Sequence, residues 1–179
     1  MKNLLRSPLL PIVVSFFPGC GDDEIPPPTP EPEVPVSCRS GSPSTIEIGR
    51  GVGGAFEALS PEADVELTAA PQGGFGVAVV LRTQRLAASE GDVLRLSLDL
   101  EISGTVAGHF ELRRPALCNS DGSGALVNGI VVGLDPARYG SNDALLALDD
   151  AVVSLVVTAT DSSGNTATVR QQVTLQVGG

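Results

Sequence analysis

Apolar and polar residues alternate along much of the chain after residue 36, most regularly between residues 93 and 102. Every second residue there is Leu or Ile, and the residues between them are Arg95, Ser97, Asp99 and Glu101. A repeat of two places the leucines on one face of a β-strand, whereas a helix would spread them around its axis. The pattern predicts a strand with one buried face and one solvent face.

Residues 106–113 continue the alternation after a break at Ser103-Gly104-Thr105, which is typical of a tight hairpin turn. In this second strand the expected inward side chains are Val106, Phe110 and Leu112, and the expected outward ones are His109, Glu111 and Arg113. The two stretches therefore predict an antiparallel hairpin.

Shorter strands are expected at residues 45–48, 65–69, 76–82 and 125–134. The last two are apolar on both faces, apart from Asn128, which predicts strands inside a sheet rather than at its edge. A polar loop over residues 135–150 follows, with a helical turn expected at 142–148.

Two β-branched stretches, 152–160 and 166–177, flank the turn Asp161-Ser-Ser-Gly-Asn165. This end of the chain resembles the last hairpin of bacterial immunoglobulin-like domains. The resemblance implies an all-β fold, an antiparallel immunoglobulin-like β-sandwich over residues 37–179. Residues 50–82, with a Gly-rich stretch and the turn Pro71-Gln72-Gly73-Gly74-Phe75, resemble uncharacterised lipoproteins of the myxobacterial type, a group with no assigned activity.

The first 19 residues have the layout of an export signal. Lys2 and Arg6 precede an apolar run over residues 9–17, which is interrupted by Pro11 and is too short to cross a bilayer core of about 20 helical residues. The small residue Gly19 directly before Cys20 resembles the lipobox of bacterial lipoproteins. The resemblance implies cleavage before Cys20 and a lipid anchor, such as palmitate, on that cysteine; an ordinary secreted protein or an uncleaved segment is the alternative.

A proline-rich linker over residues 20–36 is expected to separate the anchor from the head. Residues 25–36 have Pro at every second or third position, which excludes helix and sheet interior. As an extended spacer they would reach roughly 35–40 Å, and a disordered tether would serve the same purpose. Gly21 replaces the inner-membrane retention Asp known in some bacteria, so we expect the outer membrane rather than the inner.

Charge excludes one class of partner. The chain has a net charge of −10, and without residues 1–19 it would carry 9 basic and 21 acidic residues, a net charge of −12 (9 − 21). Nucleic acid is therefore not an expected partner, because phosphate binding needs clustered Lys and Arg. Anionic lipid surfaces would repel the chain too, so the membrane is expected as a partner only through acyl chains.

Three cysteines divide into Cys20 for lipid and a pair, Cys38 and Cys118, for a disulfide in an oxidising compartment. Such a bridge would close a loop of 81 residues and, by loop-closure entropy, stabilise the head by roughly 4–5 kcal/mol. Two unpaired thiols are the alternative.

Catalytic and metal-binding signals are weak. His109 is the only histidine, no Gly-x-Ser-x-Gly motif is present, and zinc would need three or four N or S ligands. Loop carboxylates could bind Ca²⁺, although Asp and Asn are also ordinary turn residues; the candidates are Asp121, Asp135, Asn142, Asp143, Asp149, Asp150 and Asp161.

These observations predict no enzyme and no cofactor. The expected function is that of a non-enzymatic cell-envelope lipoprotein, whose head serves contacts with an envelope or cell-surface protein or a role in envelope structure. A Ca²⁺-dependent adhesion module that uses the acidic loops is the alternative.

Overall fold

The structure, a computed structural model, describes residues 33–52, 55–71, 73–88 and 91–178 of the 179-residue chain. The expected export signal, Cys20 and most of the expected linker lie outside the described residues. No helix in the described ranges is long and apolar enough to cross a membrane.

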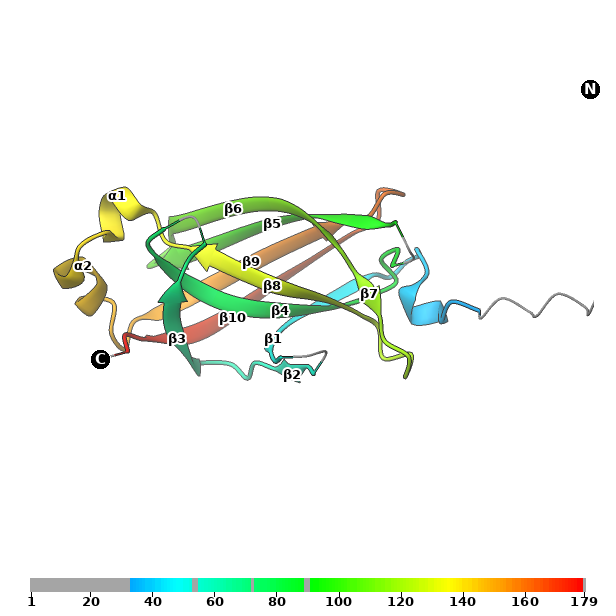
Figure 1. Cartoon of the computed structure of the whole chain (residues 1–179), viewed down its shortest axis with the longest axis horizontal. Helices are drawn as coiled ribbons and strands as arrows, with labels where there is room; N and C mark the ends of the chain where they lie inside the picture. The colour runs from blue at the N-terminus through cyan, green and yellow to red at the C-terminus, as the bar shows by residue number, and fades with distance from the viewer. Residues whose placement is uncertain (1–32, 53–54, 72, 89–90, 179) are drawn as a thin grey trace, which may run out of the picture. The chain divides into compact units, whose positions relative to one another are not determined.

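Strands dominate this part of the chain, which confirms the all-β prediction (Figure 1). The strands are β1 (Thr45–Arg50), β2 (Glu57–Ala58), β3 (Ala63–Ala69), β4 (Phe75–Gln84), β5 (Val93–Ile102), β6 (Thr105–Pro115), β7 (Leu117–Cys118), β8 (Ala125–Gly133), β9 (Val152–Thr160) and β10 (Thr166–Gln176). The helical segments are the 3₁₀ turn η1 (Val36–Cys38), α1 (Pro136–Tyr139) and α2 (Asn142–Leu146), the last of which confirms the helical turn expected there.

The strands join into one ten-stranded sheet that curls on itself, with the order β2-β1-β4-β3-β10-β9-β5-β6 and with β8 on β4 and β7 on β8 (Figure 1). β3 links the two halves, because residues 63–66 pair with β10 and residues 67–69 pair with β4. The β3–β10 pair is parallel and the others are antiparallel. The expected antiparallel immunoglobulin-like β-sandwich is not confirmed, because the strands form one continuous mixed sheet.

The inner face of the curl holds the core. The leucines of β5 point inward as the alternation predicts, and Leu96, Leu98 and Leu100 are fully buried. They pack in one cluster with alternate residues of β9 and β10, such as Leu155 and Leu175. Each such side chain contributes about 1.5–3 kcal/mol through burial.

The hairpin from β5 to β6 turns through only two residues, Ser103 and Gly104, both at positive φ, and Ile102 pairs directly with Thr105. This geometry matches the twist of the two strands. The prediction that Val106 faces inward is wrong, because the residue is 47% exposed. The ladder shifts register between Leu100 and Glu101, and this irregularity reverses the alternation at the start of β6.

The prediction of inner strands holds for β4 and fails for β8. β4 pairs with β1, β3 and β8. β8 pairs along its length with β4, but on its other edge the described residues give it a partner only at Ala125 and Leu126, which pair with β7. Residues 127–133 therefore form a sheet edge. The prediction failed because apolar residues on both faces of a strand indicate that its side chains are buried, and not that both of its edges are paired.

Candidate functional site

β6 and β8 are the two strands on either side of the opening in the curled sheet (Figure 1). Residues of both strands line a slit there. The strands meet at one end, where the amide of Asp135 donates to the carbonyl of Ala107 at 2.8 Å. At the other end β7, which follows β6 directly, pairs with β8. The cavity here, which is lined also by residues 70, 71 and 73 before β4 and by Pro136 of α1, has a volume of about 560 Å³, within the range of roughly 300–1,000 Å³ typical of ligand sites.

The slit is bordered by two strand edges. In the described residues, the ladder of β6 is formed with β5, and that of β8 over residues 127–133 is formed with β4. A bulge bends β8 at this point: Val79 pairs with Ile130 and Leu81 with Val127, which leaves two residues of β8 opposite one of β4. Gly129, in that bulge, has φ of 70° and lines the slit. Bulges are common at sheet edges near functional sites.

Two glycines, Gly76 and Gly108, allow close backbone contact with β8 at the end of the slit where Asp135 bonds to Ala107. Gly76 of β4 pairs with Gly133 of β8. A Cβ added to Gly108 of β6 would lie 2.0 Å from the carbonyl oxygen of Gly133, and one added to Gly76 would lie 2.4 Å from that of Val132. The β6–β8 contact that closes this end of the slit therefore requires glycine at position 108, and the β4–β8 ladder beside it requires glycine at position 76.

A methyl group at Gly108 is expected to force β6 away from β8. Gly108→Ala should lower the free energy of unfolding by about 1–3 kcal/mol, because backbone must move to relieve the clash. Gly133→Ala is the matched control, since its Cβ would meet nothing closer than 3.9 Å. Urea denaturation of both variants measures the difference, and equal losses would contradict this account of the contact.

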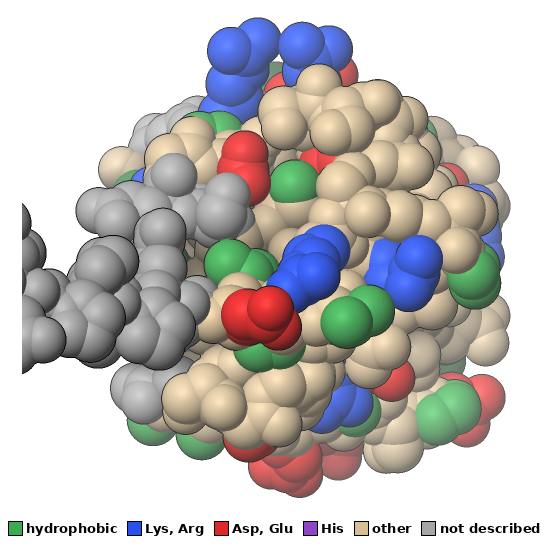
Figure 2. Space-filling view, turned by 90° about the vertical axis from the view of Figure 1, so that its right-hand side faces the viewer, with side chains coloured by type: hydrophobic (Ala, Val, Ile, Leu, Met, Phe, Trp, Pro, Cys, Tyr) green, Lys and Arg blue, Asp and Glu red, His purple; other side chains and the backbone are tan. Residues whose placement is uncertain are grey.

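Basic side chains gather on the β5–β6 hairpin at the end near β7. Arg95 and Arg113 stand directly opposite each other, and Arg114 stands opposite Leu94 and lines the slit. The salt bridges made by arginines in the described ranges involve Arg39, Arg50, Arg82 and Arg170, so these three arginines have no carboxylate partner there. Like charges directly opposite each other destabilise a sheet. In Figure 2, basic side chains project at the top, the side on which β5 and β6 lie in Figure 1.

His109 also lines the slit. Its Nδ1 lies 2.6 Å from Asp99 Oδ1, directly across the hairpin, and its Nε2 lies 3.8 Å from Glu111 Oε1. Half of its side chain is exposed, with carboxylates near both ring nitrogens. This arrangement orients an imidazole at the rim of the slit.

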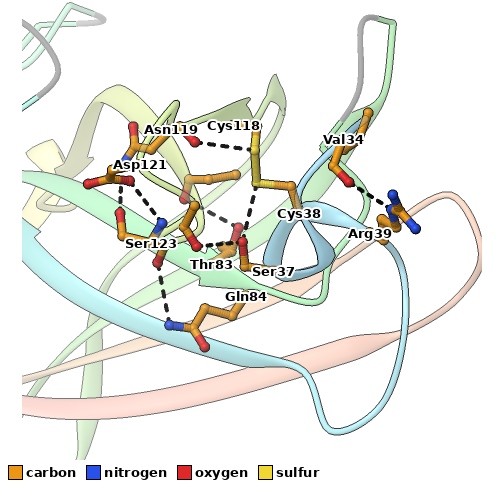
Figure 3. The surroundings of a disulfide bond; sticks show 12 residues. Val34, Ser37, Cys38, Arg39, Thr83, Gln84, Cys118, Asn119, Asp121 and Ser123 are labelled. Atoms are coloured by element: carbon orange, nitrogen blue, oxygen red, sulfur yellow. Dashed lines mark hydrogen bonds between the residues drawn. A yellow bond between two sulfur atoms is a disulfide. The ribbon is translucent and has the colours of Figure 1, made fainter. Parts of the chain in front are cut away.

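The expected disulfide is confirmed: Cys38 and Cys118 are bonded, with their Cα atoms 5.8 Å apart (Figure 3). Ser37 Oγ donates to the carbonyl of Gly122 at 2.7 Å, and the amide of Ala88 donates to the carbonyl of Cys38 at 3.0 Å. Since Cys118 ends β7, the bond ties the start of the head to the strand that closes the other end of the slit, away from Asp135.

The Ca²⁺ candidates lie apart, and most accept hydrogen bonds from nearby groups. Asp121 accepts from the amide of Ser123 and Asp135 from that of Ala137, while Asp149 accepts from the amide of Val177 and Asp150 from the side chain of Gln176. Asn142 and Asp143 begin α2. Within the described ranges, no three His, Cys, Asp or Glu side chains gather as a metal site would require.

Asp161 has a structural role that sequence reasoning did not identify. Its side chain is 6% exposed and accepts from Ser40 Oγ at 2.7 Å, from the amides of Ala87, Ser163 and Asn165, and from the Asn165 side chain. Burial alone would raise its pKa, but the hydrogen bonds outweigh burial and hold the pKa below its ordinary value. The turn sequence Asp161-Ser-Ser-Gly-Asn165 indicates the hydrogen bonds of Asp161 within the turn. It gives no sign of those from Ser40 and Ala87, which are distant in sequence.

Comparison with known proteins does not narrow the function. Neither a protein-family model nor a curated protein matches the sequence.

Proposed function

We propose that the chain is a non-enzymatic cell-envelope lipoprotein, anchored through Cys20 and holding a β-sheet head for contacts with another protein. The observation that carries this proposal is the disulfide. A Cys38–Cys118 bond forms and persists in an oxidising compartment, which an exported protein reaches. It uses two of the three cysteines, and the remaining one, Cys20, directly follows the export-signal pattern.

The surface of the head supports contact with protein better than catalysis. The slit is lined by main chain, by apolar side chains and by a few polar ones, and no metal-ligand cluster is present in the described ranges. On the face in Figure 2 hydrophobic side chains are scattered singly rather than gathered into a patch that would enter a membrane. Attachment through acyl chains fits a head of this kind.

Mass spectrometry of the mature N-terminus tests the anchor. The full chain, expressed with its own leader in a bacterial host that processes lipoproteins, should begin at Cys20 and carry added acyl mass. It should fractionate with the outer membrane. Cys20→Ser is the control and should lose both the acyl mass and the membrane association. An unmodified Cys20, or cleavage at another residue, would overturn the anchor.

A further inference from the structure

We propose that the slit between β6 and β8 binds an extended acidic segment of a partner polypeptide, which adds as a strand between the two edges. This inference deepens the protein-contact part of the proposed function and does not depend on the lipid anchor. The partner segment is expected to have its main chain in β conformation and carboxylates at one end.

The main chain along the slit can bind an added strand. An edge strand presents a row of backbone N–H and C=O groups that an added strand can pair with. Here two such edges, residues 109–115 of β6 and 127–133 of β8, face one opening; on that side neither has a ladder partner in the described residues. Only an extended main chain can bond to both sides, because a helix uses its backbone groups internally.

The length of the β6 edge fits a short strand. Seven residues of β6 span roughly 23 Å at about 3.3 Å per residue. Gly129 and Gly133 leave parts of the β8 wall without side chains, so an incoming backbone can approach closely. The wall also contains Phe110 and Val131, which can cover alternate apolar side chains of the occupant.

The arginines near the slit favour an occupant with negative charge. Arg114 lines the slit, and Arg95 and Arg113 are adjacent, all three without a carboxylate partner in the described part of the chain. The chain as a whole has a net charge of −10. A local concentration of arginine in an acidic protein favours a carboxylate near the β7 end of the slit.

The proline-rich stretch at residues 25–36 is a poor occupant, because proline has no N–H to donate to a strand edge. The acidic stretch Asp22-Asp23-Glu24 is a competing occupant from the chain itself. The experiment below separates it from a partner.

Phage-displayed seven-residue peptides, selected on the purified exported full chain, test the proposal. Selection should enrich peptides with alternating apolar residues, no central proline and an acidic end. A synthetic peptide of the best sequence should protect amides of residues 109–115 and 127–133 from hydrogen exchange. Methylation of its backbone nitrogens should weaken binding at least tenfold.

Two single-charge variants give the matched comparison. Arg114→Gln should raise the Kd of the synthetic peptide about tenfold, which corresponds to one charge-assisted contact. Arg50→Gln, on β1 and paired with Glu57, removes the same charge and should leave the Kd unchanged. Both side chains are exposed, so both variants should retain the melting temperature of the parent chain.

Three results would overturn the proposal: no enriched peptide, peptide protection confined to other strands, or equal effects of Arg114→Gln and Arg50→Gln. Much tighter binding to a variant with Asp22→Asn, Asp23→Asn and Glu24→Gln would do the same, since it would identify the chain's own segment as the occupant. The Cys20→Ser variant should bind the peptide as the parent does. Failure of peptide binding and failure of lipidation are thereby told apart.

Discussion

Replacing Cys38 and Cys118 together by alanine should lower the free energy of unfolding by roughly 4–5 kcal/mol, the largest effect expected of any change described for this protein. The bond joins residues 80 positions apart, so its removal returns a large closed loop to the unfolded ensemble. A head of this size is stable by only about 5–15 kcal/mol, so the variant should be close to unfolding at 37 °C.

The loss should be global rather than confined to the first residues of the head. Sequence composition predicts that residues 37–43 fray without the bond, because few apolar side chains hold them. In the structure they have further attachments: Arg85 donates its amide to the Ser37 carbonyl, Gly41 donates to the Arg85 carbonyl, and Ser40 bonds to Asp161. These contacts should keep the segment in place until the whole sheet opens.

Denaturant unfolding of the exported parent and of the double variant measures the effect, and thiol titration of the denatured parent confirms the bond. Cys20→Ser is the control for loss of a cysteine without loss of the bridge. Two titratable thiols in the denatured Cys20→Ser protein would mean that the bridge is absent in the exported chain. A loss below about 1 kcal/mol in the double variant would reject the loop-closure argument.

The local parts of the fold were predictable because side-chain alternation reports them directly. The leucines of β5 reveal its buried face, and Ser103-Gly104 reveals the turn that follows, since both signals depend on neighbours in sequence. The sheet order was not predictable in this way. β3 changes partner halfway, from β10 to β4, and nothing in residues 63–69 marks the change.

The slit was missed for a related reason. The apolar faces of residues 125–134 indicate that the side chains of this strand are buried. A strand with buried side chains can still lack a hydrogen-bonded neighbour on one edge. The irregularity that turns Val106 outward and the bulge at Gly129 are each one-residue effects of pairing between distant segments. A signal was present in Gly108, since glycine inside a strand pattern marks close backbone approach.

Replacing Asp161 by alanine should lower the free energy of unfolding by about 2–4 kcal/mol at neutral pH, because several donors then lose a buried acceptor. Those donors come from three separate segments: Ser40 near the disulfide, the amide of Ala87 after β4, and the turn after β9. Asp143→Ala, an exposed carboxylate in the first turn of α2, is the control and should cost less than about 1 kcal/mol.

The pH dependence of the free energy of unfolding gives a second test of the role of Asp161. The pKa of Asp161 lies below its ordinary value in the folded head, so its contribution to stability is complete above the unfolded pKa of about 4. That contribution is lost as pH falls through the lower folded pKa. The stability difference between the parent and Asp161→Asn should therefore be largest near pH 7 and shrink toward pH 3, while other carboxylates affect both proteins alike. Urea unfolding at a series of pH values measures it, and a difference that stays constant down to pH 3 would mean that the Asp161 charge does not stabilise the folded head.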